Sequence, residues 1–152
     1  MTLTEFLLAR YAEDEADARA ALEDHPAPWS AGPWREEWMD DDDWAVAQRD
    51  WASHDAGDVT NADGRMVAYD EGALGRAAAL HVARHHPGRV LADCDAKRRI
   101  LERCGDLAAY LLDSPDGDMA GWSEAVYVAA DLLRALALPY ADHPDYNPEW
   151  RP

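Results

Sequence analysis

Apolar residues at helical spacing mark the start of the chain. The capping box formed by Thr2 and Glu5 and the stop at Pro26 predict one amphipathic helix over residues 3–24. Within it, apolar side chains recur every three or four residues and define a face that a core can cover. That face carries Phe6, Leu7, Tyr11, Ala18 and Leu22.

Three more segments with this spacing fill the second half of the chain. They predict helices over 71–86, 87–112 and 120–138. Proline is favourable at the first position of a helix, so one helix ends at His86 and the next begins at Pro87. Pro139 ends the last helix, and the four prolines of residues 139–152 predict an extended tail that its aromatic residues fix to the domain.

The middle of the chain lacks this periodicity. Residues 25–43 are rich in proline and tryptophan and predict a loop. Residues 44–69 alternate loosely between apolar and polar, and Gly64 lies where a hairpin turn needs positive φ. We therefore predict a short antiparallel sheet of two or three strands, which the helices must cover on one face.

These elements predict a single α+β domain over residues 1–152, with about four helices packed on the sheet. No apolar run approaches the ~18 residues of a membrane span. The opening MTLTEFLLAR lacks the basic start and cleavage site of a signal peptide. We therefore expect no membrane association.

Charge narrows the classes of partner. The chain has 31 acids and 14 bases, a net charge of −17, which argues against direct binding to nucleic acid or an anionic membrane. Three interpretations stay open: an acidic surface that keeps the chain soluble, a basic protein partner, or mimicry of a nucleic-acid backbone.

The acidic part of the loop is a candidate partner-binding surface. Tryptophans in loops usually fold back onto a core, because an indole buries a large area. The alternative is an exposed aromatic patch beside the acids. The residues concerned are Trp34, Trp38, Asp40, Asp41, Asp42 and Asp43.

Histidines suggest a divalent metal site. His81 and His85 are four residues apart on a predicted helix, so they share a face, and His143 is a candidate third ligand. No acid follows His81, so the metalloprotease motif is absent. The alternative is that these side chains hydrogen-bond to carboxylates or carbonyls at a helix junction.

Basic residues cluster after the middle of the chain. If these residues form a small-anion site, their guanidinium groups would pair with a phosphate or carboxylate. Arg99 and Arg103 are four residues apart and therefore share one helix face. The alternative is pairing with nearby acids such as Asp95 and Glu102. The candidates are Arg84, Arg98, Arg99 and Arg103.

Motifs for catalysis are mostly absent. The sequence has no P-loop, G-x-S-x-G, G-x-G-x-x-G or C-x-x-C. On one helix, Cys94 and Cys104 would lie about 15 Å apart, too far for a disulfide. We expect them to be core thiols in a reducing compartment.

Segments 4–22, 81–102 and 133–152 together resemble an uncharacterised family, a domain of unknown function from actinobacteria and their phages. The resemblance rests on the pattern around His81, Arg84, His85, Pro87, Val90, Leu91, Lys97 and Arg98, and on residues 139–144. His86 stands where the family usually has an aspartate. The resemblance implies a cytoplasmic setting and supplies no activity. If these segments form one feature, the tail around His143 should pack near His81, Arg84 and His85.

The sequence therefore favours an acidic, cytoplasmic and non-enzymatic interaction or regulatory module with a protein partner of basic character. A homodimer through the apolar helices stays open. The alternative is a metal-binding domain or metal-dependent enzyme centred on His81, His85 and His143. A small-anion binder at Arg84–Arg103 is the third hypothesis, and no cofactor other than a divalent metal is suggested.

Overall fold

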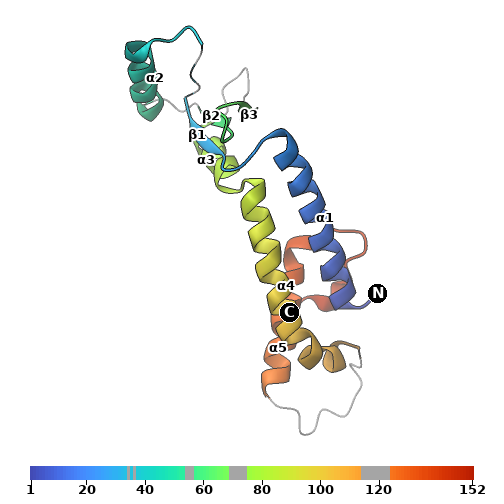
Figure 1. Cartoon of the computed structure of the whole chain (residues 1–152). Helices are drawn as coiled ribbons and strands as arrows, with labels where there is room; N and C mark the ends of the chain where they lie inside the picture. The colour runs from blue at the N-terminus through green and yellow to red at the C-terminus, as the bar shows by residue number, and fades with distance from the viewer. Residues whose placement is uncertain (34, 36, 54–56, 69–74, 114–123) are drawn as a thin grey trace. The chain divides into compact units, whose positions relative to one another are not determined.

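The fold combines α-helices with a small antiparallel sheet, which confirms the predicted α+β class (Figure 1). A computed structural model describes residues 1–33, 35, 37–53, 57–68, 75–113 and 124–152. In these ranges the elements are α1 (Leu3–Asp24), β1 (Ser30–Gly32), α2 (Asp41–Ser53), β2 (Asp58–Thr60), β3 (Met66–Ala68), α3 (Arg76–Arg84), α4 (Pro87–Asp113), α5 (Glu124–Ala137), and the 3₁₀ turns η1 (Leu138–Tyr140) and η2 (Pro148–Trp150).

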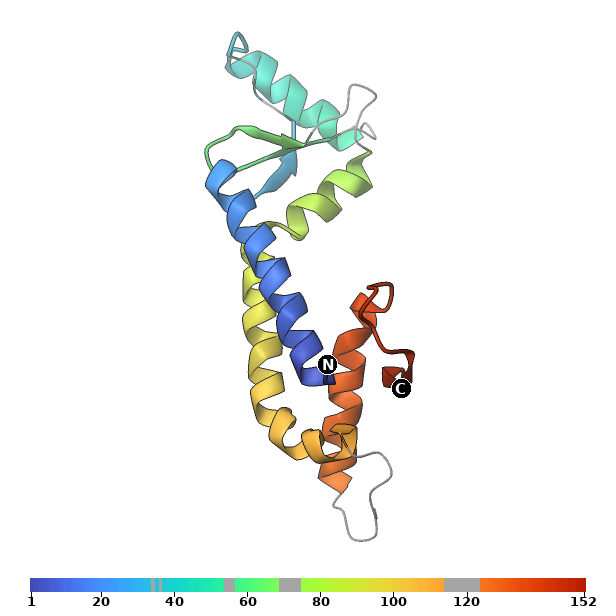
Figure 2. The ribbon, with the colours of Figure 1, turned by 90° about the vertical axis from the view of Figure 1, so that its right-hand side faces the viewer.

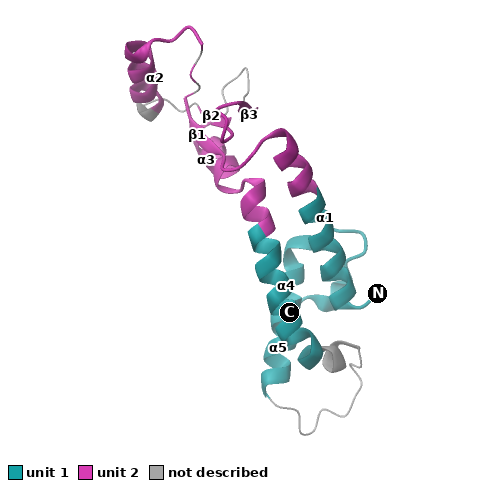
Figure 3. Ribbon diagram, viewed as in Figure 1, with its two compact units in different colours: residues 1–16, 92–152 teal, residues 17–91 magenta. Residues whose placement is uncertain are grey.

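Two compact units share these elements (Figure 3). Unit 1 comprises residues 1–16 and 92–152, and unit 2 comprises residues 17–91. The single domain over residues 1–152 stays a prediction.

Unit 1 begins with the predicted capping box. The Thr2 amide donates to Glu5 Oε2 at 2.8 Å, and the Glu5 amide donates to Thr2 Oγ1 at 3.1 Å. Within this unit α1 and α4 run antiparallel beside each other (Figure 2), and Arg98 of α4 donates to Glu15 of α1 at 2.9 Å. The buried apolar side chains are Leu3, Phe6, Leu7, Tyr11, Cys94, Leu101, Ala108, Ala129, Ala130, Leu133, Ala137 and Tyr146.

The tail packs on α1, but the prediction that residues 139–152 are extended is wrong. They form η1, turns and η2, because the φ that proline fixes suits the first turn of a helix. The Asn147 side chain caps η2 by accepting from the Glu149 amide at 3.1 Å. The buried Phe6 ring contacts the rings of Tyr140, His143, Tyr146 and Trp150, which confirms that the tail is fixed to the domain.

Unit 2 is built on the antiparallel sheet, with strand order β1-β2-β3. Ala31 pairs with Val59, and Val59 pairs with Ala68. The helix α3 covers one face of the sheet (Figure 2). On that face Val59 packs with Ala79 and Ala83 in a small core. Gly64 has φ +74°, as the predicted hairpin turn requires.

Two predictions about the middle of the chain are wrong. Residues 44–51 belong to the helix α2, not to a strand, because Asp40 caps that helix and acids in its first turn favour the helix dipole. The expected loop 25–43 contains β1, whose strand conformation comes from pairing with β2. The sheet predicted over 44–69 is therefore made from β1, β2 and β3.

The helical bounds of the second half are close to the predicted ones. The helix α4 begins at Pro87, as expected, and ends one residue beyond the prediction. The helices α3 and α5 lie inside the predicted ranges 71–86 and 120–138. The first residues of both predicted ranges, 71–74 and 120–123, lie outside the described residues.

Asn61 holds the hairpin between β2 and β3. It is 4% exposed, and its Oδ1 accepts from the amides of Asp63 at 3.0 Å and Arg65 at 2.9 Å. Asn61→Ala should lower the free energy of unfolding by about 1–3 kcal/mol, because two amides lose their acceptor. Urea unfolding measures this. Asn61→Asp keeps the acceptor and should cost clearly less, so equal losses would contradict this role.

Candidate binding cleft

A cleft of about 490 Å³ lies in unit 2 between α2 and the sheet. The helix α2 contributes Trp44, Gln48 and Trp51, which are four and three residues apart and therefore share one helix face. The full lining consists of Ser30, Ala31, Gly32, Pro33, Arg35, Trp44, Gln48, Trp51, Thr60 and Gly64. It thus combines two indoles with hydroxyl, amide and guanidinium groups.

Arginines flank both indoles of the cleft. The Arg35 guanidinium lies 5.8 Å from the centre of the Trp44 ring and forms an ion pair of 2.7 Å with Asp41. The Arg76 guanidinium lies 4.7 Å from the centre of the Trp51 ring. Each of these stackings favours a fixed position of the indole. The Trp44 end of the cleft therefore adjoins both the Arg35 guanidinium and the aspartates that begin α2, and the Trp51 end adjoins the Arg76 guanidinium.

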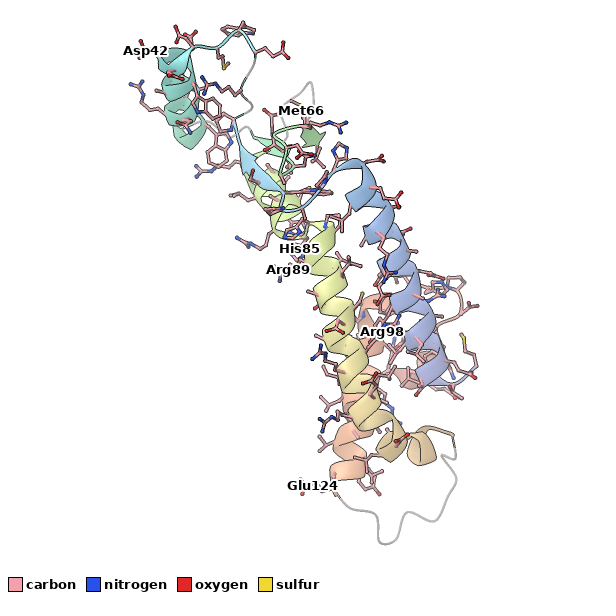
Figure 4. All side chains as sticks on the ribbon, in the orientation of Figure 1. Asp42, Met66, His85, Arg89, Arg98 and Glu124 are labelled. Atoms are coloured by element: carbon pink, nitrogen blue, oxygen red, sulfur yellow. The ribbon has the colours of Figure 1, made fainter. Side chains whose placement is uncertain are left out.

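The predicted partner-binding residues lie at the start of α2. Trp38 is 71% exposed, so its indole does not fold back onto the core. Asp40 to Asp43 are exposed too, and Asp42 projects outward from α2 (Figure 4). We call Trp38 and Asp40–Asp43 the Trp38 patch. Trp34 lies outside the described residues.

The aspartates of the Trp38 patch differ in their roles. Asp40 Oδ1 accepts from the amides of Asp42 and Asp43, both at 2.9 Å, so Asp40 is the cap of α2. Asp41 pairs with Arg35. Within the described ranges, no ion-pair partner is found for Asp42 or Asp43. These two carboxylates are the ones open to a partner.

The candidate metal ligands divide between the two units. In unit 2 the rings of His81 and His85 lie 4.4 Å apart. In unit 1 the Arg10 guanidinium donates to His143 Nε2, and Phe6 packs on the same ring. Among the described residues, no group of three or more His, Cys, Asp or Glu side chains is placed to hold a metal ion. The metal hypothesis for His81, His85 and His143 stays a prediction, which native mass before and after a chelator would test.

Two of the four candidate anion-binding arginines are paired within unit 1. Arg98 donates to Glu15, a partner that the sequence did not predict, and Arg99 pairs with Asp95 at 2.9 Å, the partner that the alternative interpretation named. Arg103 of unit 1 and Arg84 of unit 2 are exposed. Anion binding by Arg84, Arg98, Arg99 and Arg103 stays a prediction. An anion at Arg98 or Arg99 would have to displace a carboxylate.

Both cysteines are free, as predicted. Cys94 is buried in unit 1 and Cys104 is half-buried. Burial, together with neighbouring negative charge from Asp14, raises the pKa of the Cys94 thiol. A raised pKa keeps the thiol protonated, which suits a core residue and not a nucleophile.

Two tyrosines of unit 1 have raised pKa values. Burial raises the pKa of Tyr11 to about 12, with smaller contributions from Cys94, Asp93 and Asp14. Burial also raises the pKa of Tyr140, and so does its hydrogen bond to Asp14 Oδ2 at 2.5 Å. Both phenols therefore stay protonated in the folded protein at a pH where unfolded tyrosines ionise.

This difference predicts a loss of stability at alkaline pH. Since the folded pKa is the higher one, the stabilisation is complete below pH 10.0, the value for an unperturbed tyrosine, and is lost as the pH rises toward 12. The pKa difference of two units at Tyr11 contributes at most roughly 3 kcal/mol to the free energy of unfolding. Urea unfolding across this range measures the decline. An equal decline in the Tyr11→Phe/Tyr140→Phe variant would refute the assignment.

The cleft was not predicted from the sequence. The signal was available in Trp44, Gln48 and Trp51, whose spacing is that of one helix face. It was lost because the segment was expected to be a strand. Once α2 is a helix, the two indoles and the amide face the same way.

The fold and the cleft define a class: an α+β protein whose three-stranded sheet carries a helix on one face and an open, tryptophan-lined cleft toward α2. A sequence model described as a family of unknown function (DUF6221) matches residues 1–152. The chain therefore belongs to this family, which confirms the resemblance to an uncharacterised domain. Comparison with curated proteins and with solved structures gave no match.

None of the helices in the described ranges combines the length and the apolar character that crossing a bilayer requires. This agrees with the expectation of no membrane span.

Proposed function

We propose that this protein is a non-enzymatic, cytoplasmic interaction module that binds a basic partner protein through the Trp38 patch. The observation that carries this proposal is the 71% exposure of Trp38 next to four exposed aspartates. Tryptophan is enriched among the residues that contribute most to protein–protein binding. An indole left in water beside acids therefore suits a partner that carries both apolar and basic groups.

Charge supports the same proposal. Asp42 and Asp43 can pair with lysine or arginine of a partner without breaking an ion pair found in the described chain. The net charge of −17 attracts a basic partner and speeds its association at low salt. It also disfavours nucleic acid as a direct ligand.

A defined probe tests this proposal: a lysine- and arginine-rich peptide without proline, titrated against the intact protein at two salt concentrations. Asp42→Asn/Asp43→Asn should weaken binding about tenfold at low salt, and the difference should shrink at high salt. Asp40 and Asp41 stay unchanged, because they cap α2 and hold Arg35.

The matched control is Asp24→Asn/Asp63→Asn, which removes the same charge from two other exposed positions of unit 2. It should change the affinity less than twofold. Equal weakening in both double variants would mean that only the net charge attracts the peptide. That result would contradict a binding surface at the Trp38 patch.

A further inference from the structure

The geometry points to a proline-rich ligand for the cleft between α2 and the sheet. We propose that this cleft binds a partner segment in the polyproline II conformation, with the basic flank of that segment on the Trp38 patch. The inference rests on the proposed function, because it specifies which kind of basic segment the partner presents.

The spacing of the indoles matches a polyproline II helix. Trp44 and Trp51 are seven residues apart on α2, which places them about 10 Å apart along the helix axis. Polyproline II rises about 3.1 Å per residue, so three residues advance about 9 Å. Two prolines separated by two other residues would therefore each meet one indole. Aromatic-lined grooves recognise such segments elsewhere in the same manner.

The polar groups of the cleft match the rest of such a segment. Polyproline II has no internal hydrogen bonds, so its carbonyl groups need donors. The lining offers the Gln48 amide and one hydroxyl hydrogen of the pair Ser30 and Thr60, whose oxygens are hydrogen-bonded to each other at 3.2 Å. A volume of about 490 Å³ lies within the usual range of ligand sites, about 300–1,000 Å³.

Charge favours one position for the basic flank of the segment. The Trp44 end of the cleft adjoins Asp41, which begins α2, and the other aspartates of the Trp38 patch. At the Trp51 end the Arg76 guanidinium lies over the indole. We therefore expect the lysine or arginine of the ligand to lie beside the proline that meets Trp44, next to the exposed carboxylates of Asp42 and Asp43.

Three peptides test the inference on the intact protein by titration calorimetry. The first has two prolines two residues apart and a basic flank, the second replaces both prolines with alanine, and the third replaces the basic flank with serine. The first should bind at least tenfold more tightly than either of the others. Trp44→Ala should remove this preference for proline, whereas Val46→Ala, at an exposed position of α2 outside the lining, should keep it.

A second variant keeps the test independent of the stability of α2. A Cβ at Gly32, which lines the cleft, would have no neighbour within 4 Å, so we expect Gly32→Leu to place its side chain in the cleft and narrow it. It should abolish binding of the proline peptide while circular dichroism stays unchanged. Unchanged binding to a folded Gly32→Leu variant would overturn the inference.

The outcomes separate the two proposals. If the alanine peptide binds as tightly as the proline peptide, and only Asp42→Asn/Asp43→Asn weakens it, the inference is wrong and the proposed function stands. If the serine-flanked proline peptide binds as tightly as the basic proline peptide, the proposal that the partner is basic is wrong. If neither proline peptide binds, the inference is overturned.

Discussion

Phe6→Ala should lower the free energy of unfolding by about 3–5 kcal/mol. The Phe6 side chain is fully buried and contacts four rings of the tail, from Tyr140 at a centroid distance of 6.3 Å to Trp150 at 5.0 Å. Removing it leaves a cavity where the tail meets α1. Urea unfolding monitored by circular dichroism measures the loss, and limited proteolysis should show faster cleavage of the tail.

The matched control is Leu8→Ala, on the same helix but 39% exposed. Leu8→Ala should lower the free energy of unfolding by only about 1 kcal/mol, because Leu8 buries less area than Phe6 and its removal leaves no enclosed cavity. Similar losses in the two variants would contradict the packing of the tail on Phe6.

Val59→Asp should lower the free energy of unfolding by more than about 4 kcal/mol, because it places a carboxylate without a partner in an apolar core. Val59 is fully buried, pairs with Ala31 and Ala68, and packs against Ala79 and Ala83 of α3. We expect the sheet of unit 2 to lose its structure, which the amide spectra of β1, β2 and β3 would report.

Val46→Asp is the control for this variant. Val46 is 45% exposed on α2, so its substitution introduces the same charge into solvent. The expected change lies within about 0.5 kcal/mol. A folded Val59→Asp protein with unchanged sheet signals would show that Val59 does not hold α3 on the sheet.

Local chemistry made much of the helical structure predictable. The capping box of Thr2 and Glu5 and the prolines at 26 and 87 set helix ends that depend only on nearby residues. The same holds for the Gly64 turn, which needs one residue with positive φ.

The error at α2 also has a local cause. Its loose alternation of apolar and polar residues was given more weight than the aspartates at its start, although an Asp cap followed by acids is a strong helix signal. Because the segment was taken as a strand, Trp44 and Trp51 were never placed on one face. The cleft was therefore missed together with the helix.

Long-range contacts explain the remaining differences. The small residues of β1 have no strand preference of their own, and they form a strand because they pair with β2, about thirty residues later. The tail turns inward because Phe6 offers its rings a buried partner from the other end of the chain. Neither effect can be read from neighbouring residues.

The candidate sites show the same difference between what local chemistry predicts and what depends on long-range contacts. The exposure of Trp38 was one of two alternatives that sequence left open, and its surroundings decide it. For Arg99 the nearby partner Asp95 could be named in advance, because the two are four residues apart on a helix. For Arg98 the partner Glu15 comes from another helix and required the structure.

The most direct test of the account is an amide and indole ¹H–¹⁵N spectrum of the intact protein, recorded while the basic proline peptide is added. The account predicts that the indole signals of Trp38, Trp44 and Trp51 shift, together with the amides of Ser30–Gly32. Saturating shifts confined to residues of unit 1, with these three indoles unmoved, would contradict it.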